Sequence, residues 1–215
     1  MMFSLAGSGR WWLALLVVGL VSSVACGGGN GSDVGGPTST PAPQPEPTIV
    51  GSQYFFPARG YEALIPDGWN SDANIVVAGP LKIDGFFSPD EVDGVQANIS
   101  VSCEENPSGA STEQYVENRL GTLQELASTD LKTLGSVSVG GVQGQTVSYT
   151  LTRGPTTIRK IDVMVVTSTC AWTVALAAAP SEETQNREVL DRFLESFHLI
   201  DGSLPEPTAT SMPAS

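Results

Sequence analysis

Residues 136–178 read SVSVGGVQGQTVSYTLTRGPTTIRKIDVMVVTSTCAWTVALAA, and this stretch decides the fold class. It contains apolar-rich runs separated by short breaks, among them Gly140-Gly141 and Gly154-Pro155. A glycine pair favours a tight hairpin turn, and residues 147–151 alternate apolar and polar side chains as a half-buried strand does. Strands joined by such short turns pair antiparallel. The stretch therefore predicts an antiparallel meander.

The segments around this meander add another strand and two helices. Residues 95–103 alternate in the same way and predict a strand. A helix is expected to begin at Ser111, where Gln114 stands three residues on and completes a capping box. A second helix follows Pro180, and Ser181 is its expected N-cap. Runs of strands with two segregated helices predict an α+β fold, a largely antiparallel β-sheet flanked by helices, rather than an alternating α/β fold.

The region before residue 95 is rich in aromatic residues. Strands are expected at 61–65 and 75–83, and a Gly-Pro pair interrupts the second. The aromatic residues 54–56 are interpreted as an N-terminal segment packed on the sheet, with an exposed binding patch as the alternative. We expect Trp69 and Trp172 in the core.

The N-terminus has the order of a secretory signal. Arg10 provides a positive charge, residues 11–21 are apolar, and small residues precede Cys26. The apolar run is too short for a membrane-spanning helix, which needs ~20 apolar residues. The small-residue site resembles the bacterial lipobox, with Ser23 where leucine is usual. The sequence therefore predicts a lipoprotein signal peptide over 1–25, cleavage before Cys26 and a lipid anchor on its thiol. The alternative is an ordinary secretory signal in which Cys26 is incidental.

Three segments are predicted after the signal peptide. Residues 26–48 comprise the lipidated cysteine and a Gly/Pro-rich flexible tether, residues 49–202 form one domain, and residues 203–215 form a disordered tail. The domain contains nine Lys and Arg against twenty Asp and Glu, a formal charge of −11. This charge disfavours nucleic acid and anionic lipid as partners, because both need a basic surface. It suits cations or a basic partner, or solubility alone.

Several motifs follow one another along the domain: GYEALIPDGWN at 60–70, FFSPDE at 86–91, ISVSC at 99–103, STEQYVENRL at 111–120 and PSEETQNREVLDRFLESF at 180–197. In this order they resemble the PsbP-like family, with Pro66–Trp69 and Ser196-Phe197 as the sharpest matches. The resemblance covers nearly all of residues 52–200 and implies an α/β/α sandwich.

The resemblance also implies a class of function. PsbP-like proteins are mostly binding or assembly modules without catalytic machinery. The photosynthetic members help retain calcium and manganese at the oxygen-evolving centre, and one non-photosynthetic relative is a nuclear-transport factor that binds a small GTPase. No metal-binding residue of the family matches a position of this chain, so none is carried over. The Gly/Pro-rich linker does not suggest photosynthesis, and an analogy of fold does not identify a partner.

Cys103 and Cys170 are the cysteines that remain after Cys26, an even number for an oxidising compartment. Each lies on the apolar face of its expected strand. Two cysteines on the core-facing sides of strands in one small sheet can lie within bonding distance. A disulfide is therefore expected, and two separate buried thiols are the alternative.

Asp90, Glu91 and Asp93 place three carboxylates just before Gly94. Calcium sites need several oxygen ligands that converge from a loop. The spacing does not match an EF-hand loop, however, and a solvated turn is the favoured interpretation. The three acids are weak candidates for a metal site, and no metal is predicted.

His198 is the only histidine, and a position at the surface or the helix end is expected for it. The sequence provides no nucleophile with an adjacent base and no set of zinc ligands, so no catalytic residue and no cofactor is predicted. We expect a non-catalytic binding or assembly module that faces outside the cytoplasm, contacts the membrane through its anchor and binds a protein partner. The alternative is a solute- or cation-binding lipoprotein that serves a transporter, and a hydrolase with converging carboxylates ranks third.

Overall fold

A computed structural model describes residues 44–78, 81–106, 109–126 and 129–200. Within these ranges seven strands form one large sheet and four short strands form a second. The large sheet has the order β4 (Asn70–Ala78), β5 (Leu81–Val92), β6 (Val95–Glu105), β10 (Cys170–Ala178), β9 (Thr156–Val166), β8 (Val142–Arg153) and β7 (Thr129–Val139). The small sheet has the order β1 (Thr48–Val50), β2 (Gln53–Phe56), β3 (Tyr61–Leu64) and β11 (His198–Leu199).

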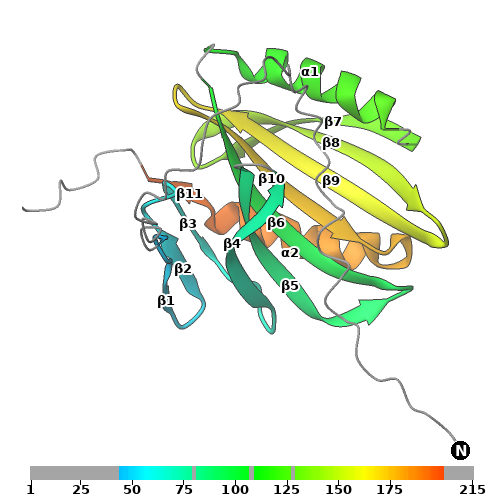
Figure 1. Cartoon of the computed structure of the whole chain (residues 1–215), viewed down its shortest axis with the longest axis horizontal. Helices are drawn as coiled ribbons and strands as arrows, with labels where there is room; N and C mark the ends of the chain where they lie inside the picture. The colour runs from blue at the N-terminus through cyan, green and yellow to red at the C-terminus, as the bar shows by residue number, and fades with distance from the viewer. Residues whose placement is uncertain (1–43, 79–80, 107–108, 127–128, 201–215) are drawn as a thin grey trace, which may run out of the picture.

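The two helices lie on opposite faces of the large sheet (Figure 1). Helix α1 (Thr112–Glu125) covers β7, β8 and β9 on one face. Helix α2 (Glu183–Ser196) and the small sheet cover the other face. Neighbouring strands in both sheets pair antiparallel, which confirms the predicted α+β class with an antiparallel sheet flanked by helices. Neither of the helices in the described ranges has the length and apolar character needed to cross a membrane.

The meander follows the predicted turns. Gly140 and Gly141 both have a positive φ and join β7 to β8, where Val139 pairs with Val142. Gly154 has a positive φ in the turn between β8 and β9. Glycine adopts such angles without steric cost because it has no Cβ. These glycines are therefore what allows the strands to fold back on one another.

One predicted strand is two strands in the structure. Residues 75–83 do not form a single run, because β4 ends at Ala78, β5 begins at Leu81, and Ile75 pairs with Ile83 across the hairpin. Proline has no backbone N–H to donate to a ladder, so a Gly-Pro pair inside an apolar run favours a turn. The prediction of one interrupted strand was wrong for this reason.

Helix α1 begins as predicted, whereas α2 does not. Ser111 Oγ accepts a hydrogen bond from the Gln114 N–H, and the Gln114 side chain accepts one from the Ser111 N–H, which completes the capping box. A 3₁₀ turn over Pro180–Glu182 precedes α2, and no side chain caps the N-terminus of that helix. This turn moves Ser181 ahead of the N-cap position. Its hydroxyl donates instead to Asp93 Oδ2 at 2.7 Å.

Two apolar cores lie on the two faces of the large sheet. The larger core joins α2, the small sheet and the large sheet, and its aromatic members are Tyr54, Phe56, Tyr61, Phe86, Trp172, Phe193 and Phe197. The smaller core lies under α1 and consists of Val116, Leu123, Val147, Tyr149 and Met164. In β9, Val163 and Val165 belong to the larger core and Met164 to the smaller one, because successive side chains point to opposite faces.

Strands β8 and β9 approach each other closely at Gly144. A Cβ atom on Gly144 would lie 2.6 Å from the Met164 carbonyl oxygen and 2.6 Å from Val165 Cγ2. Any side chain here would push β8 and β9 apart, so the close pairing of these two strands depends on glycine.

The outer strands of the large sheet are irregular. Register shifts interrupt the pairing of β4 with β5 and that of β7 with β8. The exposed apolar residues Val76 on β4 and Leu134 on β7 lie on these edges, at 62% and 46% exposure. Bulged edges hinder the addition of a further strand from another chain. The edges of the large sheet are therefore protected against such pairing.

Candidate functional site

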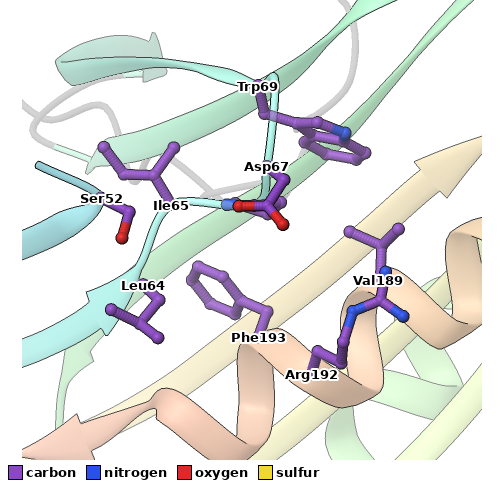
Figure 2. A pocket seen from close by; sticks show the side chains of 9 residues that line it. Ser52, Leu64, Ile65, Asp67, Trp69, Val189, Arg192 and Phe193 are labelled. Carbon is purple, nitrogen blue, oxygen red and sulfur yellow. The ribbon is translucent and has the colours of Figure 1, made fainter.

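A pocket of about 170 Å³ lies between the β3–β4 segment and helix α2 (Figure 2). Six apolar residues and three polar or charged ones line it, namely Leu64, Ile65, Pro66, Trp69, Val189 and Phe193 with Ser52, Asp67 and Arg192. Sites that enclose a small-molecule ligand usually measure about 300–1,000 Å³. This pocket is smaller, and its size suits one large apolar side chain.

The turn between β3 and β4 forms one wall of the pocket. The Trp69 N–H donates to the Pro66 carbonyl at 2.9 Å, and Gly68 between them has φ +75°. A type II turn requires such an angle at its third residue, which glycine supplies. The turn brings Asp67 and Trp69 to the pocket (Figure 2).

Helix α2 forms the opposite wall. Val189, Arg192 and Phe193 share one side of the helix, because residues three and four apart are neighbours on its surface. Near the end of α2, Ser196 Oγ accepts a hydrogen bond from the Leu64 N–H at 3.0 Å and donates one to the Phe193 carbonyl at 2.7 Å. This serine fixes the helix wall against β3.

The two sharpest motifs of the PsbP-like resemblance meet at this pocket. Pro66–Trp69 forms its turn wall, and Ser196-Phe197 ties α2 to the small sheet, where the Phe197 ring stacks on Tyr61 at 5.1 Å. Trp172 lies in the core as expected, at 6% exposure. Trp69 is only half-buried, because one side of its ring packs on the core and the indole also lines the pocket. The expectation of a core position for Trp69 was therefore only partly correct.

An exposed apolar surface continues from the pocket across the outer face of the small sheet. Val50, Phe55 and Leu64 are 70%, 36% and 49% exposed, and we call these three residues the small-sheet patch. Val50 and Leu64 pair with Gln53 from either side, so these three residues share one face of the sheet. Phe55 follows Gln53 by two residues in β2 and therefore lies on the same face. The interpretation of residues 54–56 as a packed segment is confirmed for its first and last members, which are buried, whereas Phe55 belongs to the patch.

Acidic side chains outnumber basic ones around the pocket. Glu62 pairs with Phe55 on the outer face of the small sheet, and Asp67 lines the pocket itself. On α2, Glu188 and Glu195 lie one turn before and one turn after Arg192. Neither Asp67 nor Arg192 forms an ion pair within the ranges that the structure describes. Both charges are free to contact a bound molecule.

A buried carboxylate lies on the inner side of the small sheet. Asp84 is fully buried and accepts hydrogen bonds from the Tyr61 hydroxyl at 2.8 Å and from the Asn74 N–H at 3.0 Å, with Arg59 Nη2 at 3.7 Å. Burial raises the pKa of Asp84 in spite of these contacts. The Asn74 side chain accepts from Arg59 and donates to the Pro45 carbonyl. The network thus fastens the segment before β1 to the core.

A second buried cluster of charges lies under α1. The Tyr149 hydroxyl donates to Asp162 Oδ2 at 3.0 Å, and Arg119 from α1 interacts electrostatically with the same carboxylate. Arg119 Nε and Asp162 Oδ1 are buried and have no hydrogen-bond partner among the described residues. Lys160 is 4% exposed, its side chain forms no hydrogen bond or ion pair with any residue that the structure describes, and burial lowers the pKa of its ammonium group. This cluster was not predicted, because polar residues that alternate with apolar ones in a strand usually face water.

Cys103 and Cys170 are joined by a disulfide in the structure, with their Cα atoms 5.7 Å apart. The bond connects β6 and β10, which are neighbours at the centre of the large sheet, and Cys103 pairs with Trp172 across the two strands. The arrangement is the one expected for cysteines on core-facing sides of strands. Cys26 lies outside the described residues, so its lipidation stays a prediction.

The acidic segment before Gly94 is mostly strand and not a turn. Asp90 and Glu91 lie within β5, and only Asp93 belongs to the turn that leads to β6. The pairing of Glu91 with Gln96 extends the hairpin further than the Pro-Asp-Glu composition indicates. The three acids are exposed, and no group of three His, Cys, Asp or Glu residues in the described ranges is arranged to hold a metal ion. His198 is exposed on β11, two residues after α2 ends.

Comparison with known proteins shows similarity of fold at low sequence identity. No protein-family model and no curated protein matches the sequence. The solution structure of cyanobacterial PsbP (CyanoP) from Synechocystis sp. PCC 6803 shares 18% identity, covers 76% of this chain and 99% of that chain, and has a TM-score of 0.51. The crystal structure of LpqN, involved in cell envelope biogenesis of Mycobacterium tuberculosis, shares 12% identity, covers 72% and 90%, and has a TM-score of 0.49. The likeness to cyanobacterial PsbP supports a PsbP-like fold, which agrees with the three layers described above.

Proposed function

We propose that the chain is a lipid-anchored, extracytoplasmic lipoprotein whose domain acts as a non-catalytic binding or assembly module for a protein partner. The observation that carries the proposal is the pocket together with the small-sheet patch. Exposed apolar side chains gathered on one face next to a small pocket are typical of a protein interaction site.

The size of the pocket supports a protein partner over a small solute. At about 170 Å³ it is smaller than the pockets of about 300–1,000 Å³ that enclose drug-sized ligands. A side chain from a partner would fill it, while the small-sheet patch would contact the flanking residues of that partner. Asp67 and Arg192 contribute single charges above an apolar floor, which suits orientation of a bound segment.

The N-terminal sequence supports the anchoring part of the proposal. The apolar run before Cys26 fits a signal peptide, and the 21 residues from 27 to 47 provide a Gly/Pro-rich spacer before β1. Metabolic labelling with a lipid precursor tests it. The wild-type chain is expected to incorporate label and Cys26→Ser is not, and labelling of both would contradict lipidation at Cys26.

Site-specific photo-crosslinking tests the binding part. p-Benzoylphenylalanine is placed at position 64 in the small-sheet patch, and at position 134 as the control, because Leu134 is a leucine of similar exposure on the large sheet. In native envelopes we expect a discrete protein adduct from position 64 and none of the same mass from position 134. Equal adducts from both positions, or none from position 64, would count against a partner at this surface.

A further inference from the structure

We infer that the pocket accepts a basic, extended segment of the partner, which places one apolar side chain between Trp69 and Phe193. The inference rests on the proposed function and specifies the chemistry of the partner at the same site. It combines three features of the surface, namely the apolar floor of the pocket, the carboxylates near it, and the charges of Asp67 and Arg192, which form no ion pair with any residue that the structure describes.

The apolar floor defines the anchor. Ile65, Trp69, Val189 and Phe193 line the pocket, and Leu64 extends its surface onto the small-sheet patch. A leucine-sized side chain that moves from water into such a pocket buries part of its apolar surface, which favours binding in proportion to the apolar area buried. A polar anchor would instead lose hydrogen bonds to water without replacement by these side chains.

The surrounding charge defines the flanks of the segment. Asp67 and Arg192 line the pocket. Glu62 lies on the outer face of the small sheet, and Glu188 and Glu195 lie one helical turn from Arg192 on α2. Lysine or arginine on both sides of the anchor would complement this surface, because electrostatic complementarity speeds association and suppresses wrong partners. The same charge argues against two other occupants. A second copy of the chain carries the same excess of acid, and anionic lipid headgroups are repelled by it.

The unpaired charges define the backbone conformation. Asp67 and Arg192 approach the pocket from opposite walls, one from the β3–β4 turn and the other from α2 (Figure 2). A carboxylate accepts hydrogen bonds and a guanidinium donates them. An extended segment exposes backbone N–H and C=O groups on its two sides, so it would satisfy both walls while its anchor occupies the floor.

Capped synthetic peptides test the inference against the full chain purified in detergent. The first peptide has one leucine between two threonines, with two lysines at each end. The second has serine in place of the leucine, and the third has glutamates in place of the lysines. Binding is measured by fluorescence anisotropy of the labelled peptide at low ionic strength. The protein variants are Leu64→Asp and its matched control Leu134→Asp, both at exposed positions on strands.

We expect the lysine–leucine peptide to bind saturably with a Kd below about 1 mM. The Kd of the serine peptide should be at least about tenfold higher. Leu64→Asp should lower the affinity by a similar factor and Leu134→Asp should not, while circular dichroism shows both variants folded. Equal binding of the glutamate peptide, no saturable binding of the lysine–leucine peptide, or equal losses in both variants would overturn the inference. If position 64 gives a protein adduct in native envelopes but the peptides give one of these contrary results, the proposed binding function stands and only the chemistry assigned to the partner is refuted.

Discussion

Reduction of the Cys103–Cys170 disulfide is expected to remove a large share of the domain's stability. The bond closes a loop with a sequence separation of 67 residues and connects two central strands of the large sheet. A cross-link of this span restricts the unfolded chain, and the chain-entropy relation gives a stabilisation of about 4 kcal/mol at 25 °C. Domains of this size commonly have free energies of unfolding of about 5–15 kcal/mol. The reduced domain would therefore be close to marginal stability.

The assay is urea unfolding, followed by tryptophan fluorescence, on the full chain with Cys26→Ser so that no other thiol reacts. Trp172 pairs with Cys103 and reports on this part of the sheet. With a urea dependence of about 2–3 kcal/mol per molar, a loss of about 4 kcal/mol lowers the midpoint by roughly 1.5–2 M when a reductant is present. Mass spectrometry after alkylation without reductant should show no modified cysteine in this protein.

The matched control is the variant with both cysteines replaced by alanine, Cys103→Ala with Cys170→Ala. Its midpoint should be low and insensitive to reductant, because it has no bond to reduce. A reductant-induced shift below about 0.5 M in the protein with both cysteines would refute the reasoning, and so would an equal shift in the alanine variant.

Three further predictions concern buried groups. Lys160→Met should stabilise the domain by about 1–2 kcal/mol at neutral pH, because Lys160 is buried without an ion-pair partner among the described residues. The pKa of Lys160 is lowered in the folded state, so between that lowered value and 10.5 the unfolded chain binds more protons than the folded one, and the wild-type protein becomes more stable as the pH rises. The advantage of the Met variant, measured by urea unfolding, should therefore shrink as the pH approaches 10.5. Asp84→Ala should cost about 3–5 kcal/mol in urea unfolding, because it leaves buried hydrogen-bond donors unpaired, and Asp84→Asn should cost less. Gly144→Ala should lower the free energy of unfolding by about 2 kcal/mol or more through overpacking, whereas Gly121→Ala on α1 should raise it by about 0.5–1 kcal/mol.

Each of these predictions has an outcome that contradicts it. A constant difference between Lys160→Met and wild type from pH 7 to pH 11 would show that the lysine charge is not the cause. Equal losses in the two Asp84 variants would show that the lost carboxylate charge, which both variants share, is the cause, and that the side-chain shape and acceptor oxygen kept by asparagine contribute nothing. Equal effects of alanine at Gly144 and Gly121 would show that the close approach of β8 to β9 does not limit the side chain at Gly144.

The fold was largely predictable because its elements are local. Turn residues at Gly140-Gly141 and Gly154 mark the hairpins, and the capping box at Ser111 marks the start of α1. These signals act over a few residues and need no tertiary contact. The errors occurred where a contact from elsewhere in the chain decided the structure, as for Ser181, whose hydroxyl bonds to the turn at Asp93 and not to its own helix.

The candidate site was less predictable because distant segments build it. Trp69 and the Pro-Asp-Gly turn are visible in the sequence, but nothing local shows that Leu64 packs beside Ser196. Arg192 was not singled out, because a charged residue next to an apolar helical stripe usually faces water. The second sheet was missed for the same reason. Its last strand contains only two residues and comes from the opposite end of the domain.

The small sheet determines how the domain would respond to a pulling force. If the chain is anchored at Cys26 as proposed, load enters just before β1, a three-residue edge strand whose side chains are all exposed. Load would first break the hydrogen bond from the Asn74 side chain to the Pro45 carbonyl. Peeling β1 from β2 would then break a few more hydrogen bonds and remove no buried side chain from the core. Further extension meets Tyr54, Phe56 and Tyr61, whose rings lie in the larger core. In a chain anchored in this way, β1 would be the first strand to yield under load, and its loss would remove Val50 from the small-sheet patch before the larger core opened.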